Sequence, residues 1–454
     1  MTTPLSPTPE LLAPAGSLDM MRTAFAFGAD AVYAGQPRYS LRVRNNSFGR
    51  LETLAAGITE AHAAGKAFYL VSNIVPHNAK IRTFVDDMAP VIALRPDALI
   101  MADPGLIMMV RERWPETDIH LSVQANTTNY ATVRFWQSVG IKRVILSREL
   151  SLDEIADIRQ ACPDMALEVF VHGALCIAYS GRCLLSGYFN HRDPNQGSCT
   201  NSCRWDYRVH DAIEDAAGDT HASALRTHPT AADAAAPERE DRHPEAGKVW
   251  LLEESTRPGQ LMPIEEDEHG TYILNSRDLR AIEHVARLVE IGVNSLKIEG
   301  RTKSAYYVAR TCQSYRRAIA DAVAGRPFAP QLLGALEGLA NRGYTDGFYQ
   351  RHHTPQYQNY MRGHSESGRS LLVGEVVAFD PARRMAEIEV KNRLARGDRL
   401  EFIQPAGTCE AVAEGLEDLD GNPLPLVAGS GRRIRLVVPH DFTPDAPCYV
   451  SRFV

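Results

Sequence analysis

Several hallmarks of other protein classes are missing from this 454-residue chain. Residues 1–9 are polar and proline-rich, without the basic start and apolar core of a secretory signal. No run of eighteen apolar residues occurs, so we expect no membrane span and a cytoplasmic location. The motifs His-Glu-x-x-His and Gly-x-Ser-x-Gly are also absent, which argues against the common zinc proteases and serine hydrolases.

Cysteine is scarce, and half of it is concentrated in one segment. Four of the eight cysteines lie within 28 positions, separated by six, fifteen and three residues: Cys176, Cys183, Cys199 and Cys203. A cytosolic chain keeps its thiols reduced, so clustered cysteines there more often bind metal than each other. A redox disulfide and a coincidence of spacing are the alternatives. The other four are expected to be small buried residues: Cys162, Cys312, Cys409 and Cys448.

The cysteine spacing also bears on which metal is bound. Structural zinc prefers pairs of cysteines separated by two to four residues. Cys199 and Cys203 could form one such pair, but Cys176 and Cys183 are too far apart for the second. Irregularly spaced thiolates from separate loops suit an iron–sulfur cluster. The spacing therefore favours a cluster, with zinc as the alternative.

Short apolar runs alternate with amphipathic stretches along the first 320 residues. This alternation predicts a parallel sheet, and eight strands over this length favour a closed, TIM-like (β/α)8 barrel. A further apolar run at 272–274 leaves the strand count open by one. The eight predicted strands are 11–13, 31–34, 68–71, 98–101, 119–123, 144–146, 169–171 and 296–298.

Polar residues follow most of these predicted strands. In a parallel barrel the carboxyl ends of the strands form the active face, so the repeated pattern predicts a site at the barrel mouth. Each residue alone is equally consistent with an ordinary exposed strand end. Cys176 comes four residues after His172, which places the cysteine segment at the same mouth. The polar residues are Gln36, Asn73, Asp103, Gln124, Asn126, Arg148, Glu149, His172, Glu299 and Arg301.

Three segments depart from the barrel pattern. Residues 212–247 hold eleven alanines and eight acidic residues but few large apolar ones, which predicts a flexible insertion inside a barrel domain of residues 1–330. Residues 331–367 are expected to connect this domain to the next. Short alternating strands separated by turns predict a small C-terminal β-barrel over residues 368–454.

Nucleic-acid binding has to be argued locally, because the net charge is −7. Arg38, Arg42 and Arg44, with Tyr39 and Phe48 near them, form the densest basic and aromatic segment. Such residues suit phosphate contacts and base stacking, and a solvated loop is the alternative. A weaker second patch lies in the C-terminal domain: Arg432, Arg433 and Arg435.

A family resemblance rests on ten positions. These match the signature of the collagenase-like peptidase family of unknown catalytic type: Glu168, Phe170, Gly173, Ala174, Leu175, Cys176, Gly181, Cys183, Leu185 and Ser186. The resemblance covers nearly everything except residues 212–247 and includes motifs at 10–16, 28–33, 122–126 and 297–301. Motifs at 42–46 and 190–197, with the single short C-terminal domain, resemble the branch of bacterial tRNA uridine hydroxylases.

This resemblance implies an activity and its cofactors. The chain would hydroxylate carbon five of the wobble uridine of tRNA in a prephenate-dependent reaction. The four clustered cysteines would hold a 4Fe–4S cluster. An electron donor is not identified by the resemblance.

The resemblance also directs the assignment of site residues. Arg148 and Arg301 are candidates for the carboxylates of prephenate, because a guanidinium donates two parallel hydrogen bonds. His172, Glu299 and Arg301 are the catalytic candidates. The substrate-binding candidates are Arg38, Arg42, Arg44, Gln124, Asn126 and Arg148.

Four other functions stay open at this point. Within the family, the substrate could be ribosomal RNA or a quinone precursor. A cysteine peptidase could pair Cys176 with His172, although the four-thiol cluster gives a better account of Cys176. The chain could also be a non-catalytic RNA-binding protein with a structural cluster.

Overall fold

The structure is a computed structural model. It describes residues 8–36, 38–41, 46–175, 278–339, 341, 343–350, 370–429, 431–439, 442 and 446–453, with the backbone of short strands between 207 and 271. The cysteine segment 176–206, Arg42, Arg44 and the apolar run at 272–274 lie outside the described residues.

Eight parallel strands close into a barrel, as the sequence predicts. They pair in chain order, and the last strand, β15, pairs with both β1 and β7 to close the ring. Each of the eight predicted apolar runs overlaps one of these strands, because a strand covered on both faces is almost continuously apolar. The runs 119–123 and 144–146 extend beyond the ends of β5 and β6. The strands are β1 Glu10–Pro14, β2 Ala31–Gly35, β3 Ala67–Ser72, β4 Ala98–Met101, β5 Ile119–Leu121, β6 Arg143–Ile145, β7 Ala166–Ala174 and β15 Ser295–Ile298.

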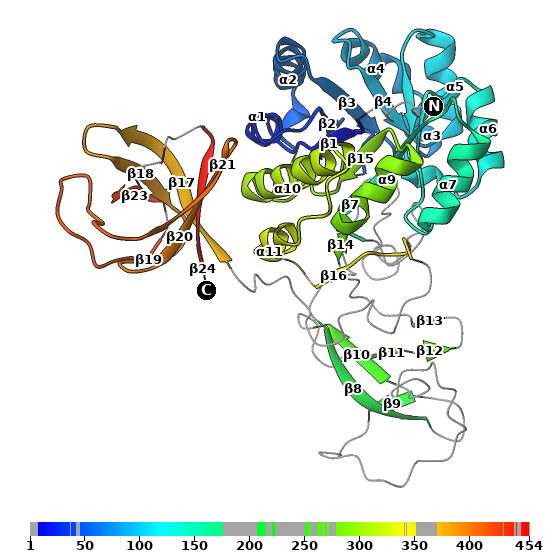
Figure 1. The fold of residues 1–454 in the computed structure, drawn as a ribbon. Coiled ribbons are helices and arrows are strands. Elements are labelled where there is room, and N and C mark those ends of the chain that lie inside the picture. Colours follow the sequence, from blue (N-terminus) through cyan, green and yellow to red (C-terminus); the bar gives the residue numbers. More distant parts are fainter. Residues whose placement is uncertain are drawn as a thin grey trace.

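Helices surround this barrel (Figure 1). Several begin at a side chain that accepts a hydrogen bond from the first turn, and Ser151 with Glu154 forms a complete capping box before α7. Their apolar faces join the strands in one core. The helices are α1 Leu18–Ala26, α2 Leu51–Ala63, α3 Asn78–Ile81, α4 Phe84–Ile92, α5 Pro104–Arg113, α6 Tyr130–Ser138, α7 Leu152–Ala161, α9 Val285–Ile291, α10 Ala305–Val323 and α11 Gln331–Glu337.

The lower interior of the barrel is charged rather than purely apolar. Arg143 Nη1 lies 2.7 Å from Glu10 Oε1 and 3.2 Å from Glu168 Oε2, and Lys297 Nζ lies 2.7 Å from Glu168 Oε1. Each charge has an opposite partner, which is the condition under which buried ions are tolerated. Burial and the two nearby cations hold the pKa of His120 well below its ordinary value, so this ring stays neutral beside them.

Additional strands lie in the chain between the seventh and eighth barrel strands, and one more, β16, follows the eighth. β14 (Asp278–Arg280) pairs antiparallel with the end of β7, and β16 (Tyr344–Thr345) pairs with β14. Residues 212–214 and 220–222 of the predicted insertion belong to strands β8 and β9, and its remainder lies outside the described residues. These small sheets contain β8 Tyr207–Glu214, β9 Thr220–Ala222, β10 Trp250–Glu254, β11 Leu261–Ile264, β12 Glu266–Asp267 and β13 Gly270–Thr271.

The C-terminal domain is β-rich, as predicted. Six strands form an antiparallel sheet in the order β21-β20-β24-β17-β18-β23, and β19 pairs with β22 in a separate ribbon. This domain has its own apolar core, which includes Phe402, Ile434 and Phe442. The strands are β17 Ser370–Asp380, β18 Met385–Val390, β19 Leu394–Ala395, β20 Arg399–Gln404, β21 Gly407–Val412, β22 Leu426–Val427, β23 Arg432–Val437 and β24 Cys448–Phe453.

In Figure 1 the C-terminal domain lies beside α1 and α10. The two domains meet around Tyr449 of β24, which contacts both helices. Its ring packs against Phe27 and Tyr306, and its hydroxyl lies 3.1 Å from Thr23 Oγ1. Arg310 of α10 forms a buried ion pair with Glu401 of β20. An apolar contact with a buried ion pair beside it fixes the C-terminal domain against the barrel wall.

Candidate active site at the barrel mouth

Cations and aromatic rings alternate across the floor of the barrel mouth. The guanidinium of Arg148 lies 3.8 Å from the centre of the Phe170 ring, and Lys297 Nζ lies 5.4 Å from the same centre. Lys297 also lies 4.4 Å from the centre of the Tyr33 ring, and the Arg301 guanidinium lies 5.7 Å from that centre. These five residues are called the mouth ladder below. Its spacings are those of cation–π contacts, which gain strength when water is excluded.

The ladder arises because every second side chain along a strand points into the barrel interior. Glu168 and Phe170 of β7 face the barrel interior together, and Lys297 of β15 stands opposite Phe170 in the strand register. Tyr33 enters from β2, and its hydroxyl donates to the Ile298 carbonyl at 2.9 Å. Residues from three separate strands are thereby brought together in one layer.

Two carboxylates partly balance the three cations of the ladder. Glu168 pairs with Lys297 from below, and Glu299 Oε2 lies 3.3 Å from Arg148 Nη2. Burial lowers the pKa of Lys297, and the neighbouring Glu168 carboxylate opposes that shift. The low dielectric of this buried layer strengthens the attraction of its cations for anions.

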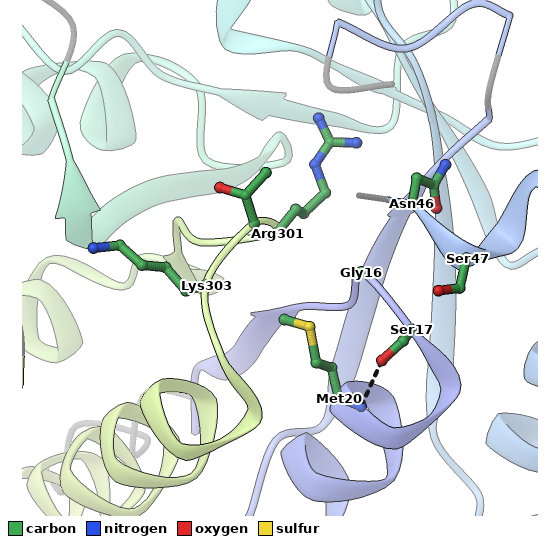
Figure 2. Close-up of a pocket in the computed structure, with 8 residues that line it drawn as sticks. Gly16, Ser17, Met20, Asn46, Ser47, Arg301 and Lys303 are labelled. Atoms are coloured by element: carbon green, nitrogen blue, oxygen red, sulfur yellow. Dashed lines mark hydrogen bonds between the residues drawn. The ribbon is translucent and has the colours of Figure 1, made fainter. Parts of the chain in front are cut away.

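A cavity of about 510 Å³ opens beside Arg301 (Figure 2). Its lining comes from the loops after β1 and β15, from the first turn of α1 and from the residues just before α2, so it lies on the carboxyl face of the barrel. Volumes of this size accommodate small organic ligands. In Figure 2 Arg301 stands between Lys303 on one side and the loops of Gly16 and Asn46 on the other. The lining residues are Gly16, Ser17, Met20, Asn46, Ser47, Arg301, Thr302 and Lys303.

Arg301 is held in place by close packing. Its Nη1 donates to Ser40 Oγ at 2.8 Å. A Cβ atom at Gly35 would lie 2.6 Å from the same nitrogen and 2.7 Å from Ser40 Oγ, closer than real contacts allow. A residue larger than glycine at the end of β2 would therefore displace the Arg301 guanidinium.

His172 is fully buried among tyrosines. The rings of Tyr307, Tyr315 and Tyr344 lie 5.5 to 5.7 Å from its own. Burial lowers its pKa to about 3, so the ring is neutral at physiological pH. Tyr315 donates its only proton to the Val171 carbonyl at 2.6 Å, and its oxygen lies 3.4 Å from His172 Nδ1. This arrangement favours a proton on Nδ1, and within the described residues Nε2 has no hydrogen-bond partner.

Gly173 brings the end of β7 against the loop after β15. Its φ is +104°, and an added Cβ would lie 2.4 Å from the Glu299 carbonyl oxygen. Only glycine fits both the backbone angle and the close approach. The chain then reaches Leu175, which directly precedes Cys176 in the sequence.

The other predicted site residues occupy the rim of the mouth. Gln124 lies in a short 3-10 turn after β5, and Asn126 accepts a hydrogen bond from Ser147 Oγ at 3.0 Å, in the loop that carries Arg148. Arg38 Nη1 lies 2.7 Å from Asp87 Oδ2, so part of its charge is already neutralised. Arg42 and Arg44 lie outside the described residues.

The four clustered cysteines also lie outside the described residues. Within the described part, no three His, Cys, Asp or Glu side chains are grouped closely enough to hold a metal ion. Among the other cysteines, Cys162, Cys312 and Cys448 are buried, as predicted, and Cys409 is half-buried.

No helix in the described part of the chain is long and apolar enough to cross a bilayer.

Two family models match the chain over nearly its whole length. The model of peptidase family U32 matches residues 16–359, and that of the peptidase family U32 C-terminal domain matches residues 369–446. The chain belongs to peptidase family U32. The U32 match spans every barrel strand except β1 and includes the mouth ladder, and the second match spans most of the C-terminal sheet.

Within the U32 family, the chain is similar to proteins named for RNA hydroxylation. It is 58% identical to the tRNA hydroxylation protein P of Escherichia coli K12, over 95% of this chain and 94% of that protein. It is 54% identical to the protein of that name from Haemophilus influenzae, over 95% and 94%. It is 28% identical to the 23S rRNA 5-hydroxycytidine C2501 synthase of Escherichia coli K12, over 87% and 52%.

Proposed function

We propose that this U32 protein is a tRNA-modifying hydroxylase. The observation that carries the proposal is 58% identity, over 95% of the chain, with a tRNA hydroxylation protein. A match of that length extends into both domains. The finer proposal is that carbon five of the wobble uridine is hydroxylated and that prephenate is the co-substrate.

The chemistry of the barrel mouth supports a small anionic co-substrate. Prephenate carries two carboxylates, one on a six-membered ring and one on a side chain of that ring. The two arginines at the ends of the mouth ladder can each donate paired hydrogen bonds to a carboxylate. The cavity beside Arg301, at about 510 Å³, is large enough for such a molecule.

The donor set of the cysteine segment fits an iron–sulfur cluster. Four thiols within 28 residues are the ligands such clusters use, and Cys176 follows the end of β7 at the mouth by two residues. Cys176, Cys183, Cys199 and Cys203 would hold the cluster. When bound, it supplies one-electron chemistry, while the ladder residues bind and orient the substrates.

The alternative functions are less well supported. A cysteine peptidase needs a histidine that can accept and return a proton near neutral pH. The pKa of about 3 and the enclosed position make His172 unsuited to that task. A ribosomal RNA substrate keeps some support from the 28% identity to the rRNA synthase, well below the identity to the tRNA proteins. A quinone precursor or a purely binding role has no comparable observation in its favour.

Nucleoside analysis tests the proposal. Total tRNA and ribosomal RNA from a strain that lacks this gene are digested and compared with those of a complemented strain. We expect hydroxylated uridine to disappear from tRNA and to return on complementation, with ribosomal RNA unchanged. A change confined to ribosomal RNA, or no change in either, would contradict the proposal. Arg148→Ala should restore the modification only when more prephenate is supplied.

A further inference from the structure

One end of the C-terminal domain gathers five cations, of which Lys391 and Arg433 pair with Glu389 and Glu387. The segments 391–397, 425–429 and 431–433 run alongside each other, joined by the β19–β22 pairing. Hydrogen bonds continue the ribbon on both sides, from Arg396 N to the Pro425 carbonyl at 3.0 Å and from Gly431 N to the Val390 carbonyl at 2.7 Å. These segments contain no aspartate or glutamate and are called the cationic ribbon below. Its cations are Lys391, Arg393, Arg396, Arg432 and Arg433.

Most of this charge is uncompensated. Arg393, Arg396 and Arg432 are exposed, and none forms an ion pair within the described residues. Other arginines of the same domain do have carboxylate partners: Arg383 with Glu417, and Arg399 with Glu410. On a chain whose net charge is −7, three neighbouring exposed arginines without an ion pair form a local positive surface.

The ribbon is anchored rather than loose. Leu394 and Val427, which pair across it, are both buried in the core of the domain. Gly429 lies so close to Asn392 that an added Cβ would be 3.2 Å from its Cα atom. The exposed arginines therefore project from a fixed backbone, which reduces the entropy lost when they bind a partner.

We propose that the cationic ribbon binds the phosphate backbone of the substrate RNA, an inference that rests on the proposed function. An RNA approaching a chain of net charge −7 needs a local positive surface, and guanidinium groups pair well with phosphate oxygens. The only large apolar side chain exposed on the described part of the ribbon is Leu426. A protein interface would need an apolar, aromatic-rich centre, which these residues do not offer.

Salt-dependent binding tests the ribbon. The full-length parent and the variant R393A/R396A/R432A are titrated with total tRNA from the deletion strain in a filter-binding assay over a range of salt. We expect the variant to bind about tenfold more weakly at low salt, with a slope of log affinity against log salt reduced by roughly two to three, because three phosphate contacts are lost. The exposed arginines make no ion pair, so unfolding curves should match the parent.

A control variant separates local contacts from net charge. R22A/R287A/R326A removes the same three charges from arginines on the barrel that are ion-paired with carboxylates. The control variant should bind tRNA within about twofold of the parent, because it changes the net charge as much as the ribbon variant does but removes no ribbon contact. R393K/R396K/R432K should keep most of the affinity, because lysine also neutralises phosphate. Equal binding by the ribbon and control variants would overturn the inference, as would a lysine variant as weak as the alanine one.

Failure of the ribbon can be told apart from failure of the proposed function. If the parent restores hydroxylated uridine in the deletion strain but the ribbon variant binds tRNA like the control, only the ribbon assignment is wrong. If the parent restores no modified nucleoside in tRNA, the proposed function fails instead, and a ribosomal RNA fragment replaces tRNA in the same binding comparison. A ribbon variant that matches the control on both RNAs overturns the inference.

Discussion

Lys297 Nζ and Glu168 Oε1 lie 2.7 Å apart inside the barrel, with 4% and 0% of their side chains exposed. Glu168 also neutralises Arg143, so one carboxylate serves two cations. Removing one member of such a buried pair leaves a charge without compensation, which is far more costly than losing an exposed pair.

Glu168→Gln should therefore destabilise the protein severely. We expect the free energy of unfolding to fall by about 3–5 kcal/mol, measured by urea denaturation followed by circular dichroism. Glu290→Gln is the matched control, because Glu290 pairs with Arg287 on the surface, and it should cost less than about 1 kcal/mol. Adding Lys297→Met to Glu168→Gln should restore part of the loss. A Glu168→Gln protein as stable as the parent would refute the role of this pair.

The sequence predicts the barrel well but not the mouth ladder. Each apolar run shows where a strand lies, because strands covered on both faces need apolar residues along their whole length. Lys297 sits inside such a run, and nothing local indicates that it faces inward toward Glu168 and Tyr33. Those partners lie 129 residues or more away in the sequence, and only closure of the ring brings them together. Arg148 and Arg301, by contrast, follow strand ends directly and were predictable from that position.

The contact between the domains is beyond sequence patterns for the same reason. Tyr449 and Thr23 are 426 residues apart, and their hydroxyls meet only after both domains have folded. The cavity beside Arg301 is likewise assembled from loops near the start and the end of the barrel. Periodicity reports on neighbours along one strand or helix, whereas a site at a barrel mouth is made by loops distant in sequence.

The buried neutral state of His172 predicts a specific acid sensitivity. Its pKa is about 3 in the folded protein and about 6.5 when unfolded, so the unfolded chain binds the extra proton between these values. Stability should thus fall as pH drops from about 6.5 toward 3, with a contribution from His172 on the order of 4 kcal/mol across that window. His172→Gln, neutral at every pH, should lose less stability on acidification than the parent. Parallel pH dependences of unfolding for the two proteins would contradict this assignment.

The packing of Gly35 against Arg301 predicts a substrate effect without unfolding. An added methyl group at Gly35 must displace the Arg301 guanidinium, because the space between it and Ser40 is already filled. Under the proposed function, Gly35→Ala should raise the prephenate concentration needed for half-maximal tRNA modification by about tenfold, the effect of one weakened charge-assisted contact. Gly105→Ala, in the exposed first turn of α5, is the control and should change it little. Unaltered prephenate dependence in Gly35→Ala would show that Arg301 does not contact this substrate.

The cysteine segment gives the last prediction, which concerns metal. Protein purified without air should be brown and contain about four irons per chain, as expected for a cluster with four cysteine ligands. Replacing Cys176, Cys183, Cys199 or Cys203 by Ser should remove most of the iron, because each supplies a thiolate. Cys312→Ser is the control. Cys312 is buried within the barrel domain, and burial raises the pKa of its thiol to about 12. Stoichiometric zinc without iron in anaerobic protein would replace the cluster by a zinc site at the same four positions.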